Sequence, residues 1–126
     1  METQDRFSWT KRGKSFGYAF RGIACMFATQ HNSWIHAAVT LIVIAGAIWF
    51  RLTLTEWCLL ALATGLVLAA EAFNTATEAM VNFISPDFNE KAGKIKDLGA
   101  AAVLIAAIFA AITGLIIFVP YFIRLF

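Results

Sequence analysis

The sequence contains little charge. Of its 126 residues, 14% are charged and 60% are hydrophobic. Soluble domains carry about a quarter charged residues, so the composition predicts one polytopic membrane domain covering residues 1–126. The alternative is a very apolar soluble helical bundle, which is disfavoured because the helices of such a bundle need polar faces.

Cysteine is also rare, and the glycine-rich loops of soluble nucleotide-binding proteins are absent. Cys25 and Cys58 have no metal-ligand spacing, so they are interpreted as two unrelated thiols. Neither GxxxxGK(S/T) nor GxGxxG occurs in the chain. The fingerprints of soluble nucleotide-binding folds therefore give no support for a nucleotide site.

Long apolar stretches are present instead, and they predict an all-α membrane protein. Basic and apolar residues alternate irregularly over about 6–30, which is typical of an amphipathic helix in the membrane interface. Three apolar stretches predict transmembrane helices over 34–50, 55–84 and 94–122. The second helix should be about 45 Å long at 1.5 Å per residue, so we expect it to protrude into the cytoplasm.

Basic residues gather in two places, and their positions predict the topology. Five of the ten precede the first apolar stretch and three lie between the second and the third; they are Arg6, Lys11, Arg12, Lys14 and Arg21, then Lys91, Lys94 and Lys96. The positive-inside rule places the N-terminus and the 85–97 loop in the cytoplasm. Residues 51–55 and the C-terminus are then outside.

One predicted transmembrane helix carries a stripe of polar side chains. At about 100° per residue, its four members fall within roughly 80° of one another; they are Glu71, Asn74, Glu78 and Asn82. Carboxylates at bilayer depth cost a few kcal/mol each, so they are rarely without function. Three short helices would leave this stripe facing lipid, so we expect a homo-oligomer. By contrast, His36 is interpreted as a satisfied interfacial histidine rather than a ligand.

These residue types suit phosphoryl transfer at a membrane surface. Glu78 could hold Mg²⁺ together with phosphate oxygens, and Lys96 could neutralise a phosphate. Glu71 lies deeper and could accept the proton of a lipid hydroxyl as a general base. Two structural alternatives remain: an ion pair between Glu78 and Lys96, and a protonated core carboxyl at Glu71. From spacing alone, a small proton-coupled membrane carrier that uses Glu71 is favoured over a kinase.

Three motifs taken together resemble the prokaryotic diacylglycerol kinase family. They are Glu71-Ala-Phe-Asn74-Thr-Ala-Thr-Glu78-Ala, Ser85-Pro-Asp-Phe-Asn-Glu and Lys96-Asp97-Leu-Gly-Ala-Ala-Ala-Val, and the resemblance extends over about 14–115. It implies a homotrimeric three-span lipid kinase of the bacterial inner membrane with an N-terminal surface helix. ATP as co-substrate, Mg²⁺ and a membrane lipid alcohol are then expected, and no nucleic acid.

The resemblance also implies a role for individual residues. Glu71 matches the catalytic base, Asn74 the asparagine beside it, and Glu78 the metal-binding glutamate. The nucleotide-binding positions would be Tyr18, Gln30, Glu78, Asp87, Phe88, Asn89, Lys96 and Asp97. By the same analogy, Lys11 and Lys14 would lie near the lipid headgroup or the phosphates.

The chain also departs from the family pattern. Gln30 occupies the position of a second metal-binding glutamate, Asn82 that of a frequent aspartate, and Asn89 that of a histidine in some members. These changes remove negative charge near the metal, so a catalytically inactive scaffold is one alternative. The resemblance implies conversion of diacylglycerol to phosphatidic acid. The stretch 31–36 and the 85–88 loop are closer to the branch that includes undecaprenol kinases, so undecaprenyl phosphate is the alternative product.

Overall fold

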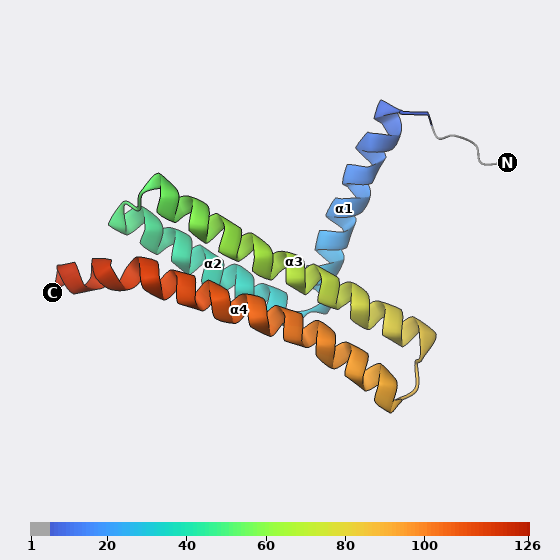
Figure 1. Ribbon diagram of the computed structural model, residues 1–126. Coiled ribbons are helices and arrows are strands. Elements are labelled where there is room, and N and C mark those ends of the chain that lie inside the picture. The colour runs from blue at the N-terminus through green and yellow to red at the C-terminus, as the bar shows by residue number, and fades with distance from the viewer. Residues whose placement is uncertain (1–5) are drawn as a thin grey trace.

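The computed structural model describes residues 6–126, and this part of the chain is built from helices alone. The helices are α1 (Trp9–Thr29), α2 (His31–Phe50), α3 (Leu54–Ile84) and α4 (Glu90–Leu125). Figure 1 shows α2, α3 and α4 lying side by side as a bundle, with α1 leaving the bundle steeply beside α3. This arrangement confirms the predicted all-α fold class. Residues 1–5 of the predicted domain lie outside the described part.

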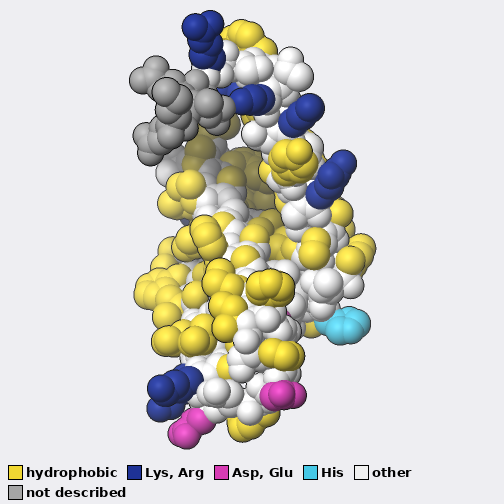
Figure 2. Space-filling view, turned by 90° about the vertical axis from the view of Figure 1, so that its right-hand side faces the viewer, with side chains coloured by type: hydrophobic (Ala, Val, Ile, Leu, Met, Phe, Trp, Pro, Cys, Tyr) yellow, Lys and Arg dark blue, Asp and Glu magenta, His cyan; other side chains and the backbone are white. Residues whose placement is uncertain are grey.

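Three of the helices are long and apolar enough to cross a membrane. They are α2 with 20 residues, α3 with 31 and α4 with 36. Large apolar side chains such as Leu62, Phe73 and Phe109 point outward from α3 and α4, and apolar side chains cover much of the face seen in Figure 2. A surface of this kind is unfavourable in water, so the chain is a membrane protein with three candidate spans.

The turn between α2 and α3 is short and tightly bonded. Arg51 adopts the left-handed conformation with φ 55°, and the backbone N–H of Leu52 donates to the carbonyl of Ala47 at 3.2 Å. Thr53 then caps α3 by accepting the N–H of Glu56 at 3.2 Å. The turn makes α2 and α3 antiparallel, which places residues at similar sequence distances from it at the same level of the bundle.

Polar and apolar side chains pack together at the end of the bundle where the α2–α3 turn lies. The Tyr121 hydroxyl of α4 donates to Glu56 Oε1 at 2.8 Å, which joins α4 to the start of α3. Beneath it, buried apolar side chains from α2, α3, α4 and the α2–α3 turn pack together; they are Ala47, Leu52, Leu60 and Ile117. This cluster is far from the 85–89 loop and supports the fold rather than the polar stripe.

The helix boundaries differ from the sequence expectation mainly in α4. Its N-terminus is Glu90 rather than residue 94, because the Asn89 side chain accepts the N–H groups of Lys91 at 2.8 Å and Ala92 at 3.4 Å. The helix continues through Pro120 to Leu125 rather than ending at 122. The surface helix spans 9–29 rather than 6–30. The helix α2 begins at His31 rather than at residue 34, and α3 begins at Leu54 rather than at residue 55.

Candidate functional site

The polar stripe divides into a buried part and an exposed part. Glu71 is fully buried and Asn74 is 6% exposed, whereas Glu78 is half-buried and Asn82 is exposed. The neighbouring helices therefore cover the first two residues within a single chain. Burial within one chain already shields Glu71 from lipid, so no other subunit is needed to cover this residue.

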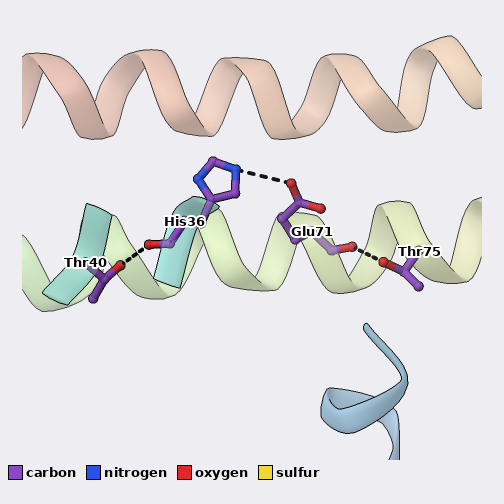
Figure 3. Close-up of polar contacts among 4 residues, drawn as sticks. All are labelled: His36, Thr40, Glu71 and Thr75. Carbon is purple, nitrogen blue, oxygen red and sulfur yellow. Dashed lines mark hydrogen bonds and ion pairs between the residues drawn. The ribbon is translucent and has the colours of Figure 1, made fainter. Parts of the chain in front are cut away.

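Glu71 is paired with a histidine of α2. His36 Nε2 lies 3.2 Å from Glu71 Oε1, an ion-pair distance, and Figure 3 shows the imidazole and the carboxylate pointing toward one another. Within the described residues, neither carboxylate oxygen of Glu71 has a hydrogen-bond donor. The Thr75 hydroxyl donates to the Glu71 carbonyl at 2.8 Å, so it satisfies only the backbone. The interpretation of His36 as a merely interfacial histidine is therefore incomplete.

Asn74 lies one turn further along α3, against α4. Its Oδ1 atom is buried without a hydrogen-bond partner in the described part of the chain, as is the hydroxyl of Ser33 on α2. Gly99 makes the close approach of α4 possible, because a Cβ atom at this position would lie 2.6 Å from Asn74 Oδ1. Buried polar atoms without partners are rare, and here they gather on the helix faces that surround Glu71.

Replacing Gly99 with alanine should disturb this contact. The added methyl group must displace the Asn74 amide or separate α3 from α4, and overpacking of this kind costs about 1–3 kcal/mol. Thermal unfolding of the purified protein in detergent should show a lower Tm for Gly99→Ala. Gly65→Ala is the matched control, because a Cβ atom there has nothing within 4 Å. Equal Tm values for the two variants would contradict the importance of the close approach.

Glu78 is joined to the corner between α1 and α2. The Gln30 Nε2 group donates to Glu78 Oε2 at 2.7 Å. Gln30 is the single residue between the two helices, and the corner is held by the Trp34 indole, which donates to the Phe27 carbonyl at 2.8 Å. The structure thus brings together the two residues that the sequence predicts as metal ligands.

Lys96 bonds to Asn82 rather than to Glu78. Its Nζ atom lies 2.6 Å from Asn82 Oδ1. In residues 6–126 no ion pair joins Lys96 to Glu78, so the structural alternative of an interhelical ion pair between them is not observed. Lys96 is half-buried and the neighbouring Asp97 is exposed. Both lie on α4 at the end of the bundle near the 85–89 loop.

The loop and α1 present the remaining candidates at the surface. Asp87 is exposed and Phe88 is 94% exposed, whereas Asn89 uses its side-chain oxygen to cap α4. On α1, Lys14 and Tyr18 line a shallow hollow with Arg21, whose guanidinium lies 5.7 Å from the Tyr18 ring centre. Lysine and arginine side chains gather along this helix (Figure 2). Lys11 is among its exposed residues.

The structure does not bring every predicted residue into one site. Gln30 meets Glu78, and Lys96 lies near the same end of α3. Lys14 and Tyr18 lie on α1, which projects from the bundle (Figure 1), and no hydrogen bond or ion pair links either residue to Glu71 or Glu78 in residues 6–126. The described residues also contain no group of three or more histidine, cysteine, aspartate or glutamate side chains able to hold a metal.

An apolar groove lies beside the buried pair. It has a volume of about 610 Å³ and runs between α2, α3 and α4, from His36 at one end to Phe122 at the other. Its wall includes Thr40, Gly46 and Leu68, and it includes His36 but not Glu71. The histidine thus stands between the groove and the carboxylate.

Comparison with known proteins identifies relatives over most of the chain. Residues 17–118 match the family model described as prokaryotic diacylglycerol kinase. The chain is 36% identical to the undecaprenol kinase of Bacillus subtilis over 107 residues, 85% of this chain and 87% of that protein. It is 32% identical to the diacylglycerol kinase of Escherichia coli K12 over 114 residues, 90% of this chain and 93% of that protein.

A cyanobacterial relative is longer. The chain is 39% identical to the diacylglycerol kinase of Synechocystis sp. over 107 residues, which is 84% of this chain and 61% of that protein. This chain therefore spans less than two-thirds of the Synechocystis protein. The region matched by the family model contains every predicted site residue except Lys11 and Lys14.

Proposed function

Because the chain belongs to the prokaryotic diacylglycerol kinase family, we propose that it transfers the γ-phosphate of ATP to the hydroxyl of diacylglycerol, yielding phosphatidic acid. The observation that supports this proposal best is the fully buried carboxylate of Glu71 on a candidate membrane span. Glu78 lies about two helical turns nearer the 85–89 loop. A lipid hydroxyl and a water-soluble nucleotide could thus meet along one helix.

In the proposed reaction, Glu71 accepts the proton of the lipid hydroxyl. As the proton moves to the carboxylate, the hydroxyl oxygen bonds to the γ-phosphorus, and the bond from that phosphorus to the β,γ-bridging oxygen breaks to release ADP. Glu71 holds the proton at the end of the step. Phosphoryl transfer mainly requires positioning and charge neutralisation, so no covalent enzyme intermediate is required.

Glu78 and Gln30 would hold Mg²⁺. Their side chains meet at 2.7 Å, and Mg²⁺ in kinases is often bound by one or two carboxylates together with phosphate oxygens, so the residues fit the ion. Gln30 turns its nitrogen toward Glu78, and its amide must rotate to present oxygen to the same ion. The bound ion would neutralise charge on the β- and γ-phosphates.

The nucleotide would lie between the 85–89 loop and α1. Lys96 would offset phosphate charge, with Asn74 supporting the site beside Glu71. Asp97, Asp87, Phe88, Asn89 and Tyr18 would complete the nucleotide contacts, and Lys11 and Lys14 would meet the headgroup or the phosphates. The exposed basic side chains along α1 support an interfacial position for this helix.

The assembly and location are proposed by analogy with the family. We expect a homotrimer in the bacterial inner membrane, with the N-terminus and the 85–89 loop in the cytoplasm. The distribution of basic residues supports this orientation. Chemical cross-linking in membranes and protease accessibility of the 85–89 loop from the cytoplasmic side test these two points.

Undecaprenol is the second candidate substrate. The match to the Bacillus subtilis undecaprenol kinase covers nearly as much of this chain as the match to the Escherichia coli protein does. Both candidate lipids carry a primary alcohol on a long apolar body, so the same base and metal ligands would serve either.

One assay tests the function and the substrate together. Purified protein in mixed micelles is supplied with ATP, Mg²⁺ and either diacylglycerol or undecaprenol, and lipid phosphorylation is followed. We expect phosphatidic acid to form faster than undecaprenyl phosphate. A faster reaction with undecaprenol would reverse the substrate assignment. No product from either lipid at any Mg²⁺ concentration would refute the kinase proposal.

The glutamine at position 30 should limit the affinity for Mg²⁺. Gln30→Glu adds a second carboxylate at hydrogen-bond distance from Glu78, so the Mg²⁺ concentration for half-maximal activity should fall by about an order of magnitude. Gln4→Glu adds the same charge outside the region that the family model matches and serves as the control. An unchanged Mg²⁺ titration for Gln30→Glu would show that residue 30 is not a ligand.

A further inference from the structure

We propose that His36 is a positioning residue that pairs as an imidazolium with Glu71 and keeps its carboxylate ionised and oriented inside the bundle. The inference rests on the proposed function and deepens it, because an ionised Glu71 is the form that accepts a hydroxyl proton. It starts from the ion-pair contact of Glu71 within residues 6–126, the 3.2 Å approach of His36 Nε2 to Oε1.

The burial of Glu71 makes a partner necessary. Its side chain has no exposed surface, whereas that of His36 is 23% exposed. A buried carboxylate without hydrogen-bond donors or an opposite charge is strongly unfavourable and takes up a proton instead. His36 is the group of the described chain that contacts this carboxylate and can carry positive charge.

The geometry leaves one oxygen of Glu71 for the substrate. His36 approaches Oε1, and Oε2 has no partner in residues 6–126. Figure 3 shows the imidazole extending from α2 to one side of the carboxylate. The Thr40 hydroxyl donates to the His36 carbonyl at 2.7 Å and so engages the backbone of His36 rather than its ring. His36 therefore orients Glu71 from one side. Oε2 is buried as well, so the packing around it must open before the lipid hydroxyl meets it.

His36 lies in the groove wall, so its competing role is direct contact with the lipid. The two roles affect different kinetic constants. A residue that positions the base acts on the chemical step and lowers kcat, whereas a residue that binds the lipid raises its KM.

The protonation state of Glu71 can be measured without any activity. Infrared spectroscopy of the purified protein in detergent detects the carbonyl stretch of a protonated carboxyl group. We expect His36→Leu to show a protonated-carboxyl band that the wild type lacks and that disappears in the His36→Leu/Glu71→Gln double variant. The same band in the wild type, or no such band in His36→Leu, would overturn the proposal.

Kinetics in mixed micelles supply the second measurement. His36→Leu should lower kcat on the order of 10²-fold, with the KM values for lipid and ATP within about twofold of the wild type. His36→Gln keeps an N–H donor and should recover part of the lost kcat; it also serves if His36→Leu does not fold. The control is His31→Leu, which removes the other histidine of the chain, an exposed residue.

The outcomes separate this inference from the proposed function. An increase in lipid KM at unchanged kcat would overturn the positioning role and make His36 a lipid contact. Unchanged kcat and KM in His36→Leu would overturn it as well. If the wild type phosphorylates no lipid, the kinase proposal fails, while the infrared comparison still decides whether His36 keeps Glu71 ionised.

Discussion

Glu71→Gln should reduce lipid phosphorylation by about 10²–10⁴-fold, the usual contribution of a positioned general base. The amide has nearly the same shape as the carboxyl group and can still approach His36, so the packing between α2 and α3 should survive. It cannot accept the proton of the lipid hydroxyl. The effect should therefore lie in kcat, with nucleotide binding unchanged.

The control for this variant is on the same helix. Glu56→Gln also converts a carboxylate of α3 to an amide, but at the opposite end, where the amide oxygen can still accept the Tyr121 hydroxyl. Turnover and nucleotide binding are measured for both variants, the latter by isothermal titration with a non-hydrolysable ATP analogue. Full activity of Glu71→Gln would remove Glu71 from the role of base.

The sequence predicts the helices well because their signals are local. Apolar stretches long enough to cross a bilayer give α2, α3 and α4, and the spacing of Glu71 and Asn74 correctly predicts that they share one face of α3. The charged residues after Pro86 indicate a loop and therefore do not predict the start of α4 at Glu90. Asn89 provides the cap that starts the helix earlier, and an asparagine before a glutamate is the signal that could have indicated it.

The contacts between helices are harder to predict from the sequence than the helices themselves. The short turn at 51–53 makes α2 and α3 antiparallel. His36 and Glu71 lie at similar sequence distances from this turn, and so do Gln30 and Glu78. The sequence therefore predicts that the members of each pair lie at similar heights in the bundle. The rotation of α2 about its own axis could not, because α2 is apolar on nearly all sides and no periodicity distinguishes the side that faces α3. The apolar pattern of α2 therefore does not predict the contact of His36 with Glu71.

The partner of Lys96 depends on the same kind of information. By sequence distance from the 85–89 loop, Lys96 is level with Glu78 rather than with Asn82. Its Nζ atom nevertheless bonds to Asn82 Oδ1 at 2.6 Å, one helical turn nearer the loop. The stripe pattern alone could not reveal this, since Asn82 and Glu78 are one turn apart on the same face. Glu78 therefore bonds to Gln30 rather than to Lys96, and its carboxylate is available to a metal ion.

Glu78→Gln should raise the Mg²⁺ concentration for half-maximal activity by at least about tenfold, because it removes the carboxylate of the proposed metal site. Two amides at positions 30 and 78 can still form a hydrogen bond, so the corner between α1 and α2 should be retained. Glu56→Gln is again the control, since it leaves the Mg²⁺ titration unchanged if the site is at Glu78.

The double variant Gln30→Glu/Glu78→Gln makes this test sharper. It moves the carboxylate to the other member of a pair whose side chains meet at 2.7 Å and leaves the total charge unchanged. If both residues face one ion, the double variant should recover most of the Mg²⁺ affinity lost in Glu78→Gln, so the two substitutions should be strongly non-additive. Recovery requires that the ion lies between the two side chains. Additive effects would place the metal on Glu78 alone and leave Gln30 as a structural hydrogen-bond donor.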